Sequence, residues 1–480
     1  MILAIDLGTT NWKAALITHE GRIAQLVRIP TPVMQEDGCP CYEAAAVGDH
    51  LAGLLQQCPP GDRSRIDLIA LTGMAEAGLI VDRDTLSPLS NVWPWFDRRA
   101  LPVYEETRAD PRFAGRHERT GLPDSYKYGI YKLLTLLGTG RYDKSRVKWM
   151  GLVAYAASLF TGQCCEDVSI AARTDCVDLR RGCWDEPFLQ SIGLDSGMFP
   201  ALIPQGGLAG TLREDLYGIR AGTPVCIGGH DHVCASYASG ALQQGGVFLS
   251  TGTAQVVLGP AHAPETASGL SYGPSPCFAP YTCLGSIQSA GGSVNFWKER
   301  LYPGEDFATL LREVQAAPVP SGLLYHPYLA GSGAPHLDPN ACGTLIGLRD
   351  TTSRAGIIAA VYEGIAMETR YLVETMGAQT GMLYCMGGLT RHTRYMQTLA
   401  DVLSMTVCVP DMDEGTLYGA ARLALDRLGR SALPPLAAAR SHAPDTDAHA
   451  RWNSIFRQLY LPMMNHTKAE VMNLWNSSKQ

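Results

Sequence analysis

Two segments far apart in the chain place a Gly/Thr turn between apolar runs, a pattern that can bind anions. The first turn is Gly8-Thr9-Thr10, after MILAIDL, and the second is Thr251-Gly252-Thr253, after VFLS. Each segment predicts a β-hairpin, over residues 1–17 and 247–259, whose tight turn exposes backbone N–H groups and hydroxyls. Glycine lets the backbone approach a ligand closely, so successive N–H groups can converge on phosphate oxygens. Two such turns suggest two halves that grip one polyphosphate.

Asp231 is the candidate acid–base residue. It follows an apolar run and two glycines and precedes small and apolar residues at helical spacing, so a strand should give way to a helix there. An Asp at such a junction is often only a helix N-cap, which contributes ~0.5–2 kcal/mol to the stability of the helix. Alternatively, its carboxylate accepts the proton of a hydroxyl that attacks a phosphoryl group, a role worth ~10²–10⁴-fold in rate. The segment alone leaves both interpretations open.

A further glycine pair, Gly387-Gly388, follows an apolar run and precedes a helical pattern. The apolar positions of that pattern are Tyr395, Met396, Leu399, Val402 and Leu403. Ordinary strand-to-helix packing explains such a segment. The alternative is that the glycine pair lets a flat adenine lie against the backbone.

The elements that must position these residues alternate between strand-like and helical patterns. Apolar runs at 67–71, 225–227, 383–386 and 406–409 predict strands within an α/β layered fold. A boundary is expected near residues 240–246, where GALQQGG precedes the second hairpin. The Gly-, Pro- and Ser-rich segment 260–280 predicts a long loop or irregular excursion, and a helical pattern covers about residues 449–463.

Composition narrows the class of protein. The chain has 480 residues, enough for two or three domains, with 46% hydrophobic and 18% charged residues. A net charge of −7 gives no reason to expect nucleic acid or an anionic membrane as a partner. The 14 cysteines are irregularly spaced without a CxxC, which favours free thiols in a reducing cytoplasm. We expect no secretion signal and no membrane span, since the apolar runs are short and interrupted by charges.

Three other enzyme classes fit the sequence poorly. The segment Gly269 to Gly273 satisfies GxSxG, but it lies between prolines without the strand and helix that a nucleophile elbow needs. No GxGxxG follows an expected strand, which argues against a dehydrogenase. A Walker A site is excluded because the chain has no Gly-Lys dipeptide.

The combination of motifs resembles the FGGY family of carbohydrate kinases, collinearly across most of the chain. The family opens with Asp-x-Gly-Thr-Thr and a basic residue three positions further on, which is similar to Asp6 to Thr10 with Lys13. The family's Trp-x-Asp-x-Arg segment is similar to Trp95 to Arg99. Further similarities lie at Thr120 to Pro123 with Lys132, at Pro327 to Gly331, and at Glu414 with Gly419 to Ala421.

The resemblance implies an α/β fold of two actin-like ATPase (ribonuclease H-like) domains with a central cleft. The expected N-terminal domain, residues 1–243, binds the sugar and carries the first phosphate hairpin, and the C-terminal domain, residues 244–480, binds ATP.

The resemblance also assigns roles to residues. It implies that Asp231 is the catalytic base and that Asp6 lies near Mg²⁺. The implied ATP-binding residues are Gly8, Thr9, Thr10, Lys13, Thr251, Gly252, Thr253, Gly291, Asn295, Gly387, Gly388 and His392. The implied substrate-binding residues are Glu76, Trp95, Asp97, Arg99, Lys127 and His232. A carboxylate such as that of Glu76 can accept hydrogen bonds from two substrate hydroxyls.

Several positions depart from the family pattern, and these departures concern the substrate more than the nucleotide. His232 stands where close relatives have Gln or Asn, and Lys127 stands where glycerol kinases have a substrate-binding tyrosine. Lys127 is either a solvated cation or a contact to a substrate carbonyl or carboxylate. The other departures lie further along the chain. Ser332-Gly333 stands where the family often has Glu-Arg, and Cys342 stands where an arginine is common. The family also has an acidic or amide residue near the position of Gly356.

We therefore expect a cytoplasmic, Mg²⁺- and ATP-dependent kinase that phosphorylates a hydroxyl of a small sugar, sugar acid or polyol by direct in-line transfer. The alternatives are a non-kinase ATP-binding protein of the actin or heat-shock chaperone-like fold and a degenerate sugar kinase. Asp231, Glu76 and the segment Trp95 to Arg99 favour the kinase, because a non-kinase needs neither a proton acceptor nor a wall that binds hydroxyls. The expected partner is a small molecule, and a homodimer stays open.

Overall fold

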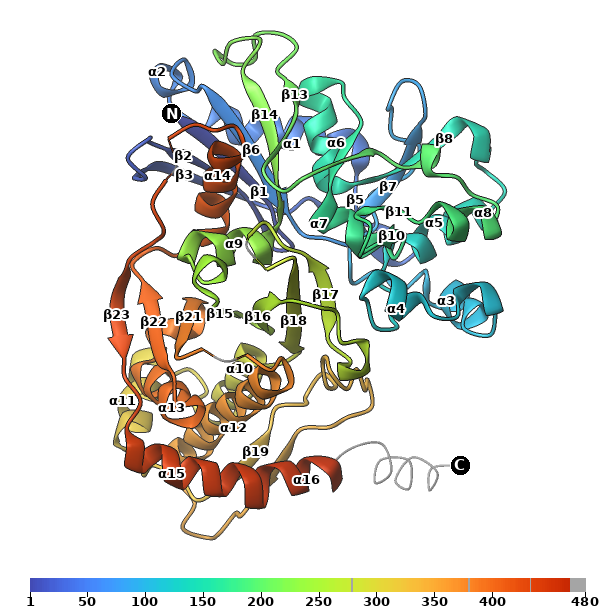
Figure 1. Cartoon of the computed structure of the whole chain (residues 1–480). Helices are drawn as coiled ribbons and strands as arrows, with labels where there is room; N and C mark the ends of the chain where they lie inside the picture. The colour runs from blue at the N-terminus through green and yellow to red at the C-terminus, as the bar shows by residue number, and fades with distance from the viewer. Residues whose placement is uncertain (278, 379, 432, 467–480) are drawn as a thin grey trace. The chain divides into compact units, whose positions relative to one another are not determined.

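The computed structural model in Figure 1 describes residues 1–277, 279–378, 380–431 and 433–466, which form two units defined by their internal contacts. Unit 1 comprises Met1–Ala238, Tyr272–Tyr281 and Glu414–Pro435, and unit 2 comprises Ser239–Ser271, Thr282–Asp413 and Leu436–Gln480. Each unit is built around one larger β-sheet. The division into functional domains at residues 1–243 and 244–480 stays a prediction. By contacts, the segments 272–281 and 414–435 belong with unit 1.

The sheet of unit 1 has the strand order β13-β14-β6-β1-β2-β3. Its strands are β1 (Ile2–Leu7), β2 (Asn11–Ile17), β3 (Ile23–Pro30), β6 (Leu68–Gly73), β13 (Gly207–Thr211) and β14 (Pro224–His230). β1 and β2 form the predicted antiparallel hairpin, whereas β6 runs parallel to both β1 and β14. Every residue of β1 and β6 is buried, as is typical of parallel strands covered on both faces.

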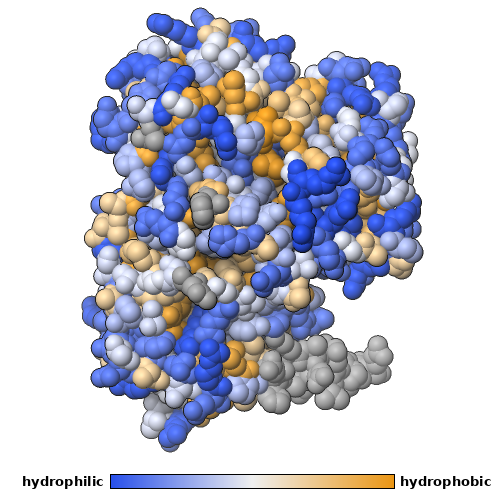
Figure 2. Space-filling view, in the orientation of Figure 1, coloured by the Kyte–Doolittle hydropathy of each residue, from blue (hydrophilic) through white to orange (hydrophobic). Residues whose placement is uncertain are grey.

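Helices cover this sheet and supply the rest of the unit 1 core. The helix α6 (Leu152–Thr161) packs on β6, β13 and β14, and α14 (Gly415–Arg427) packs on β1, β6 and β14. The helix α9 (Asp231–Ser239) follows β14 directly. Further helices of unit 1 are α1 (Val47–Gln56), α3 (Leu101–Thr107), α5 (Gly129–Gly138), α7 (Val168–Ala171) and α8 (Glu186–Ser191). In the view of Figure 2 the surface is mostly hydrophilic, with hydrophobic residues gathered over α6 and the neighbouring strands.

Unit 2 repeats the pattern of strand directions found in unit 1. In its sheet the strands β18 (Tyr281–Ile287), β16 (Gln255–Ala261), β15 (Val247–Thr251), β21 (Met382–Gly387), β22 (Thr406–Pro410) and β23 (Ala438–His442) are neighbours in that order. β15 and β16 form the second predicted hairpin, and β15, β21 and β22 are parallel. A hairpin followed by two parallel strands therefore occurs in both sheets, and the two Gly/Thr turns occupy equivalent positions in them.

The helices of unit 2 are α10 (Gly291–Leu301), α11 (Phe307–Ala316), α12 (Arg354–Thr375), α13 (Thr393–Leu403), α15 (Thr446–Ile455) and α16 (Leu461–His466). The long helix α12 contacts α10, α11 and α13, and α15 packs on α13 (Figure 1). The helical pattern expected at 449–463 falls within α15, a short π-helix (Phe456–Tyr460) and α16.

One expected irregular segment is partly regular. Within residues 260–280 the structure contains the strand β17 (Ser271–Pro274) and a 3-10 turn at Thr266–Ser268. Ser271 begins a strand, so the GxSxG match forms no strand-to-helix elbow. All 14 cysteines are free thiols, as expected. In the described part of the chain, no helix combines the length and apolar character needed to cross a bilayer.

Candidate active site

The first Gly/Thr turn joins β1 to β2 and carries two charged residues at its base. Asp6 pairs with Lys13 in the antiparallel register, and the turn between them contains Gly8, Thr9 and Thr10. The indole Nε1 of Trp95 donates to Thr9 Oγ1 at 3.0 Å. A predicted substrate residue and a predicted phosphate residue thus contact each other within unit 1.

Asp6 is a buried carboxyl group with an unusual environment. Burial raises the pKa of Asp6 to about 8, and the carboxylates of Asp231 and Glu414 act in the same direction, against Lys13. Its Oδ1 has no hydrogen-bond partner among the described residues. Carboxylate oxygens are the ligands that Mg²⁺ prefers, and a divalent cation would favour the ionised form of Asp6. The residues present therefore fit a magnesium ion at Asp6.

Lys13 is held by a carboxylate from α14. Its Nζ lies 3.0 Å from Glu414 Oε2, and Arg28 approaches the other oxygen of Glu414 at 2.5 Å. Glu414 occupies the N-cap position of α14 and is nearly buried, whereas the Lys13 side chain is 27% exposed. The ammonium group is thereby fixed beside the turn and stays accessible to an anion.

Asp231 lies where β14 ends and α9 begins, as predicted. Asp6, Thr72 and Gly229 are aligned across the parallel strands β1, β6 and β14, and Thr72 Oγ1 donates to the carbonyl of Gly229 at 2.7 Å. Ligand sites of α/β sheets form at the carboxyl ends of such strands. Asp231 is two residues beyond Gly229, so it lies at the same edge as Asp6.

The junction before Asp231 is fixed by close packing. Gly229 has φ +126°, and a Cβ there would approach Ser169 Oγ to 2.8 Å. That hydroxyl accepts the backbone N–H of His230 at 2.9 Å and is bonded in turn to Asp167. Glycine is required at this position because the chain must pass close to Ser169 with a positive φ.

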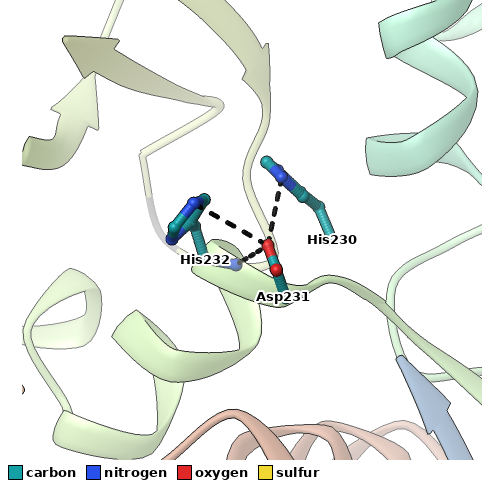
Figure 3. A group of neighbouring side chains, drawn as sticks. All are labelled: His230, Asp231 and His232. Atoms are coloured by element: carbon teal, nitrogen blue, oxygen red, sulfur yellow. Dashed lines mark hydrogen bonds and ion pairs between the residues drawn. The ribbon is translucent and has the colours of Figure 1, made fainter. Parts of the chain in front are cut away.

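Figure 3 shows Asp231 between two imidazoles. Its Oδ1 accepts the backbone N–H of His232 at 2.7 Å and lies 3.2 Å from His230 Nε2 and 4.0 Å from His232 Nε2. The Asp231 side chain is 26% exposed, so a ligand can reach it. Burial lowers the pKa of His230 to about 4, which leaves that imidazole neutral near pH 7. The ligand atoms of all three residues lie within 4.8 Å of one another, a group that could also hold a metal suited to imidazole.

Glu76, the predicted binder of hydroxyls, is paired with an arginine that the sequence did not single out. Its Oε1 lies 2.5 Å from Nη2 of Arg173, in the 3-10 helix Ala172–Thr174, and its backbone carbonyl accepts from Lys132 of α5. Burial would raise the pKa of Glu76, but the charge and hydrogen bond of Arg173 outweigh burial and lower it. The carboxylate is therefore ionised and can still accept hydroxyl hydrogen bonds.

Arg173 and Lys132 complete this substrate-side group. Arg173 is 97 residues from Glu76 in the chain, and no local motif marks it. Lys132 is fully buried, and burial lowers its pKa to about 7. Lys127 lies with its ammonium 5.0 Å from the centre of the Trp95 ring, which is a cation–π arrangement.

Two other predicted substrate residues are engaged in holding their own loop. Arg99 forms a two-pronged ion pair with the buried Asp97, binds Glu36 at 2.6 Å, and stacks over Trp93. Asp97 has no exposed side-chain surface. The structure thus shows Asp97 and Arg99 positioning the loop that carries Trp95, and a direct contact with substrate stays a prediction.

Unit 2 contains a cavity of about 420 Å³ at the second Gly/Thr turn. It is lined by Thr251, Gly252, Thr253, Gly291, Val294, Asn295, Phe307, Leu311, Gly388, Leu389, Arg391 and His392. The structure therefore brings together every unit 2 residue of the predicted ATP site except Gly387. Gly387, with φ +107°, ends β21, and a Cβ there would approach the Thr251 carbonyl oxygen to 2.2 Å.

The cavity walls combine glycines and apolar side chains with polar residues, the basic Arg391 and a histidine that is neutral near pH 7. A Cβ on Gly291 would approach the Gly252 carbonyl oxygen to 2.4 Å, whereas a Cβ on Gly388 would meet open space. Thr251 Oγ1 donates to the Met386 carbonyl at 3.0 Å, so its proton is engaged within unit 2. His392 is bonded to the Tyr362 hydroxyl, and burial lowers its pKa to about 4.

Both α/β units contain a sheet in which a hairpin is followed by two parallel strands. One unit carries the carboxylates of Asp6 and Asp231, and the other contains a glycine-lined cavity. This combination is typical of a two-domain phosphotransferase. Family models agree: the N-terminal domain of the FGGY family of carbohydrate kinases matches residues 1–238, and its C-terminal domain matches residues 247–426. The chain belongs to the FGGY family of carbohydrate kinases. The predicted family, enzyme class and two-domain actin-like ATPase fold are thereby confirmed.

The relatives and solved structures described below match this chain over nearly its whole length and over nearly their own. The chain is 27% identical to the glycerol kinase of Solidesulfovibrio magneticus, over 88% of this chain and 89% of that protein. It is 26% identical to the xylulose kinase of Bacillus subtilis, over 97% of each chain. Its fold matches the gluconate kinase of Lactobacillus acidophilus with a TM-score of 0.88 and 21% sequence identity. It also matches the structure of Plasmodium falciparum glycerol kinase with ADP, with a TM-score of 0.86 and 20% sequence identity. Each match covers 98% of both chains.

Proposed function

We propose that this carbohydrate kinase transfers the γ-phosphoryl group of ATP to a hydroxyl of a small sugar, sugar acid or polyol, with Asp231 as general base. The observation that carries the proposal is the position of Asp231: it is a partly exposed carboxylate at the carboxyl edge of the sheet that also presents Asp6. The names of the relatives, glycerol kinase and xylulose kinase, support a polyol or sugar acceptor.

As general base, the Asp231 carboxylate would accept the hydroxyl proton as the oxygen attacks phosphorus. The neutral His230 beside it can orient Oδ1 without adding charge. Glu76 would hold a second hydroxyl, which fixes the acceptor relative to Asp231.

The phosphate charge would be neutralised in unit 1 by Lys13 and by the N–H groups of the turn Gly8 to Thr10. Mg²⁺ held by Asp6 would supply further charge neutralisation when it is bound. In unit 2, the apolar wall of Val294, Phe307 and Leu389 and the open face of Gly388 suit an adenine ring. The ADP in the Plasmodium falciparum glycerol kinase supports nucleotide binding by this fold. A cytoplasmic location and a homodimer stay predictions.

The decisive experiment is an ATP-consumption screen with the purified chain over ketoses, polyols, pentoses and aldonates. The best substrate is then compared between wild type, Asp231→Ala and Asp231→Asn, with Asp84→Asn on an exposed loop as the matched control. We expect kcat to fall about 10²–10⁴-fold in both Asp231 variants and not in the control. A screen without any stimulated turnover, or an Asp231→Ala enzyme as fast as wild type, would refute the assignment.

A further inference from the structure

Lys127 is the one departure from the family pattern that places a charge among the predicted substrate residues. It lies in the loop before α5, partly buried, with its ammonium over the face of Trp95. Among the described residues, no carboxylate lies within ion-pair distance of its Nζ. A partly desolvated cation without a counter-charge is costly unless a ligand supplies one.

The nearest charges compensate Lys127 only in part. Burial lowers the pKa of Lys127 most, Glu76 raises it, and Arg173 lowers it. Glu76 and Arg173 form their own ion pair at 2.5 Å, so Arg173 offsets part of the attraction between Glu76 and Lys127. Lys132 is close enough to be affected by Lys127 and adds positive charge to the same region.

The Asp97 carboxylate acts on Lys132, whose pKa it raises, and not on Lys127. Both of its oxygens accept from the guanidinium of Arg99, and its side chain is fully buried. The group formed by Glu76, Arg173, Lys127 and Lys132 contains three basic side chains and one acidic one, with the Asp175 carboxylate beside Arg173. Within this group Lys127 keeps no ion-pair partner and lies next to an aromatic face that can pack on the C–H groups of a sugar.

We propose that the acceptor of this kinase is a sugar acid whose carboxylate binds Lys127, while Trp95 packs on its carbon chain and Glu76 accepts its hydroxyls. This inference rests on the proposed function and selects one substrate class within it. A neutral polyol or ketose would leave the ammonium without a partner, whereas a carboxylate forms a charge-assisted hydrogen bond with it. Such a bond is worth about 10- to 100-fold in affinity.

The test compares acceptors of the same chain length: each acid and its polyol differ only at C1, and the acid and the ketose differ at C1 and C2. D-gluconate, D-glucitol and D-fructose, and D-xylonate, xylitol and D-xylulose, are assayed for ATP consumption with the full chain. We expect kcat/KM for the acid to exceed that of its polyol and its ketose by about 10-fold or more. If a polyol or a ketose is the better acceptor, the inference fails and the proposed function stands. If no compound of any class stimulates turnover, the proposed function fails and the inference with it.

Variants of Lys127 separate a binding role from a structural one. Lys127→Met keeps the apolar stem over Trp95 and removes the charge, so KM for the acid should rise about 10-fold or more, and by much more than KM for the polyol. Lys127→Arg should retain the preference for the acid, and Lys144→Met, at an exposed site of unit 1, should behave as wild type. Equal losses on acid and polyol, or an unchanged KM for the acid in Lys127→Met, would overturn the assignment. A rise in thermal stability with D-gluconate but not with D-glucitol checks the wild-type preference without any variant.

Discussion

At the scale of single residues, Glu76 shows how the site is assembled. Its φ of +55° is uncommon for a residue with a Cβ, and such conformations are found where the surroundings fix the chain. Here Arg173 holds the side chain and Lys132 holds the backbone carbonyl. The carboxylate of Glu76 is therefore presented in one orientation, which is what a group that accepts substrate hydroxyls requires.

The Glu76–Arg173 pair predicts a stability effect. Both side chains are less than one-fifth exposed, at 12% and 16%, so Arg173→Met would leave a buried charge without its partner. We expect the free energy of unfolding to fall by about 3–5 kcal/mol in urea titrations. The double variant Glu76→Gln/Arg173→Met should regain much of this loss without regaining activity. Arg180→Met, with an exposed side chain, is the control and should change stability by less than about 0.5 kcal/mol. A double variant no more stable than Arg173→Met would contradict this account.

His392 predicts a pH dependence of stability. Burial lowers the pKa of His392 from 6.5 to about 4, so this side chain is protonated at a lower pH in the folded chain than in the unfolded chain. The contribution of this group is fully present above pH 6.5 and is lost as the pH falls from 6.5 towards 4. Between pH 7.5 and 5.5 we expect a loss of about 1 kcal/mol that His392→Gln removes, measured from denaturant midpoints. An unchanged pH slope in the variant would show that His392 does not contribute.

At the scale of elements, the close approach of α14 to α9 and β14 depends on glycine. A Cβ on Gly419 would lie 1.8 Å from the Cys234 carbonyl oxygen of α9, and a Cβ on Gly228 of β14 would lie 2.8 Å from Ala420 Cβ. Neither glycine has room for a methyl group. The Gly-Ala-Ala segment of α14 is therefore a packing motif, which fixes the helix whose N-cap residue, Glu414, binds Lys13.

This packing gives a prediction with an internal control. Gly419→Ala should destabilise the chain by more than about 2 kcal/mol, since backbone atoms must move to admit the methyl group. Gly53→Ala in α1, where a Cβ would meet no atom within 4 Å, should instead stabilise by up to about 1 kcal/mol through helix propensity. Urea unfolding of both variants measures the difference. Equal effects of the two substitutions would contradict the close approach of α14.

The sequence predicted the elements whose signals are local. Both hairpins and the strand-to-helix junction at Asp231 were correct, because a turn motif between apolar runs is encoded within about fifteen residues. β17 was missed, since Ser271–Pro274 is short and surrounded by turn-forming residues. Arg173 was missed for a different reason. Its partner is 97 residues away, and nothing in its own segment marks it as part of a site.

At the scale of the whole molecule, the two units carry different chemistry on the same sheet pattern. Unit 1 carries Asp6, Asp231 and Glu76, the carboxylates proposed for catalysis and substrate binding, whereas unit 2 contains a cavity whose wall is largely apolar side chains and glycines. The chain returns from unit 2 to unit 1 at Glu414 to add α14. The acceptor and the nucleotide base are thus expected to bind to separate sets of residues.

Separate sets of residues mean that nucleotide binding can be removed without loss of the acceptor site. Saturating Mg-ATP should stabilise the wild-type chain, by about 2.7 kcal/mol at 100 times its Kd. Gly388→Trp should abolish this stabilisation, because its side chain would enter the cavity from a position with no neighbouring atom and no strained φ. Gly381→Trp, equally open but outside the cavity, is the matched control and should respond to Mg-ATP as wild type does. The acceptor identified in the screen should still raise the thermal stability of Gly388→Trp, since all of its proposed binding residues belong to unit 1. In Asp231→Asn, by contrast, stabilisation by Mg-ATP should remain and turnover should be lost.

Two outcomes would contradict this account. If Mg-ATP still stabilises Gly388→Trp, the adenine does not bind in this cavity. If Gly388→Trp loses stabilisation by both Mg-ATP and the acceptor, the two sets of residues do not act independently.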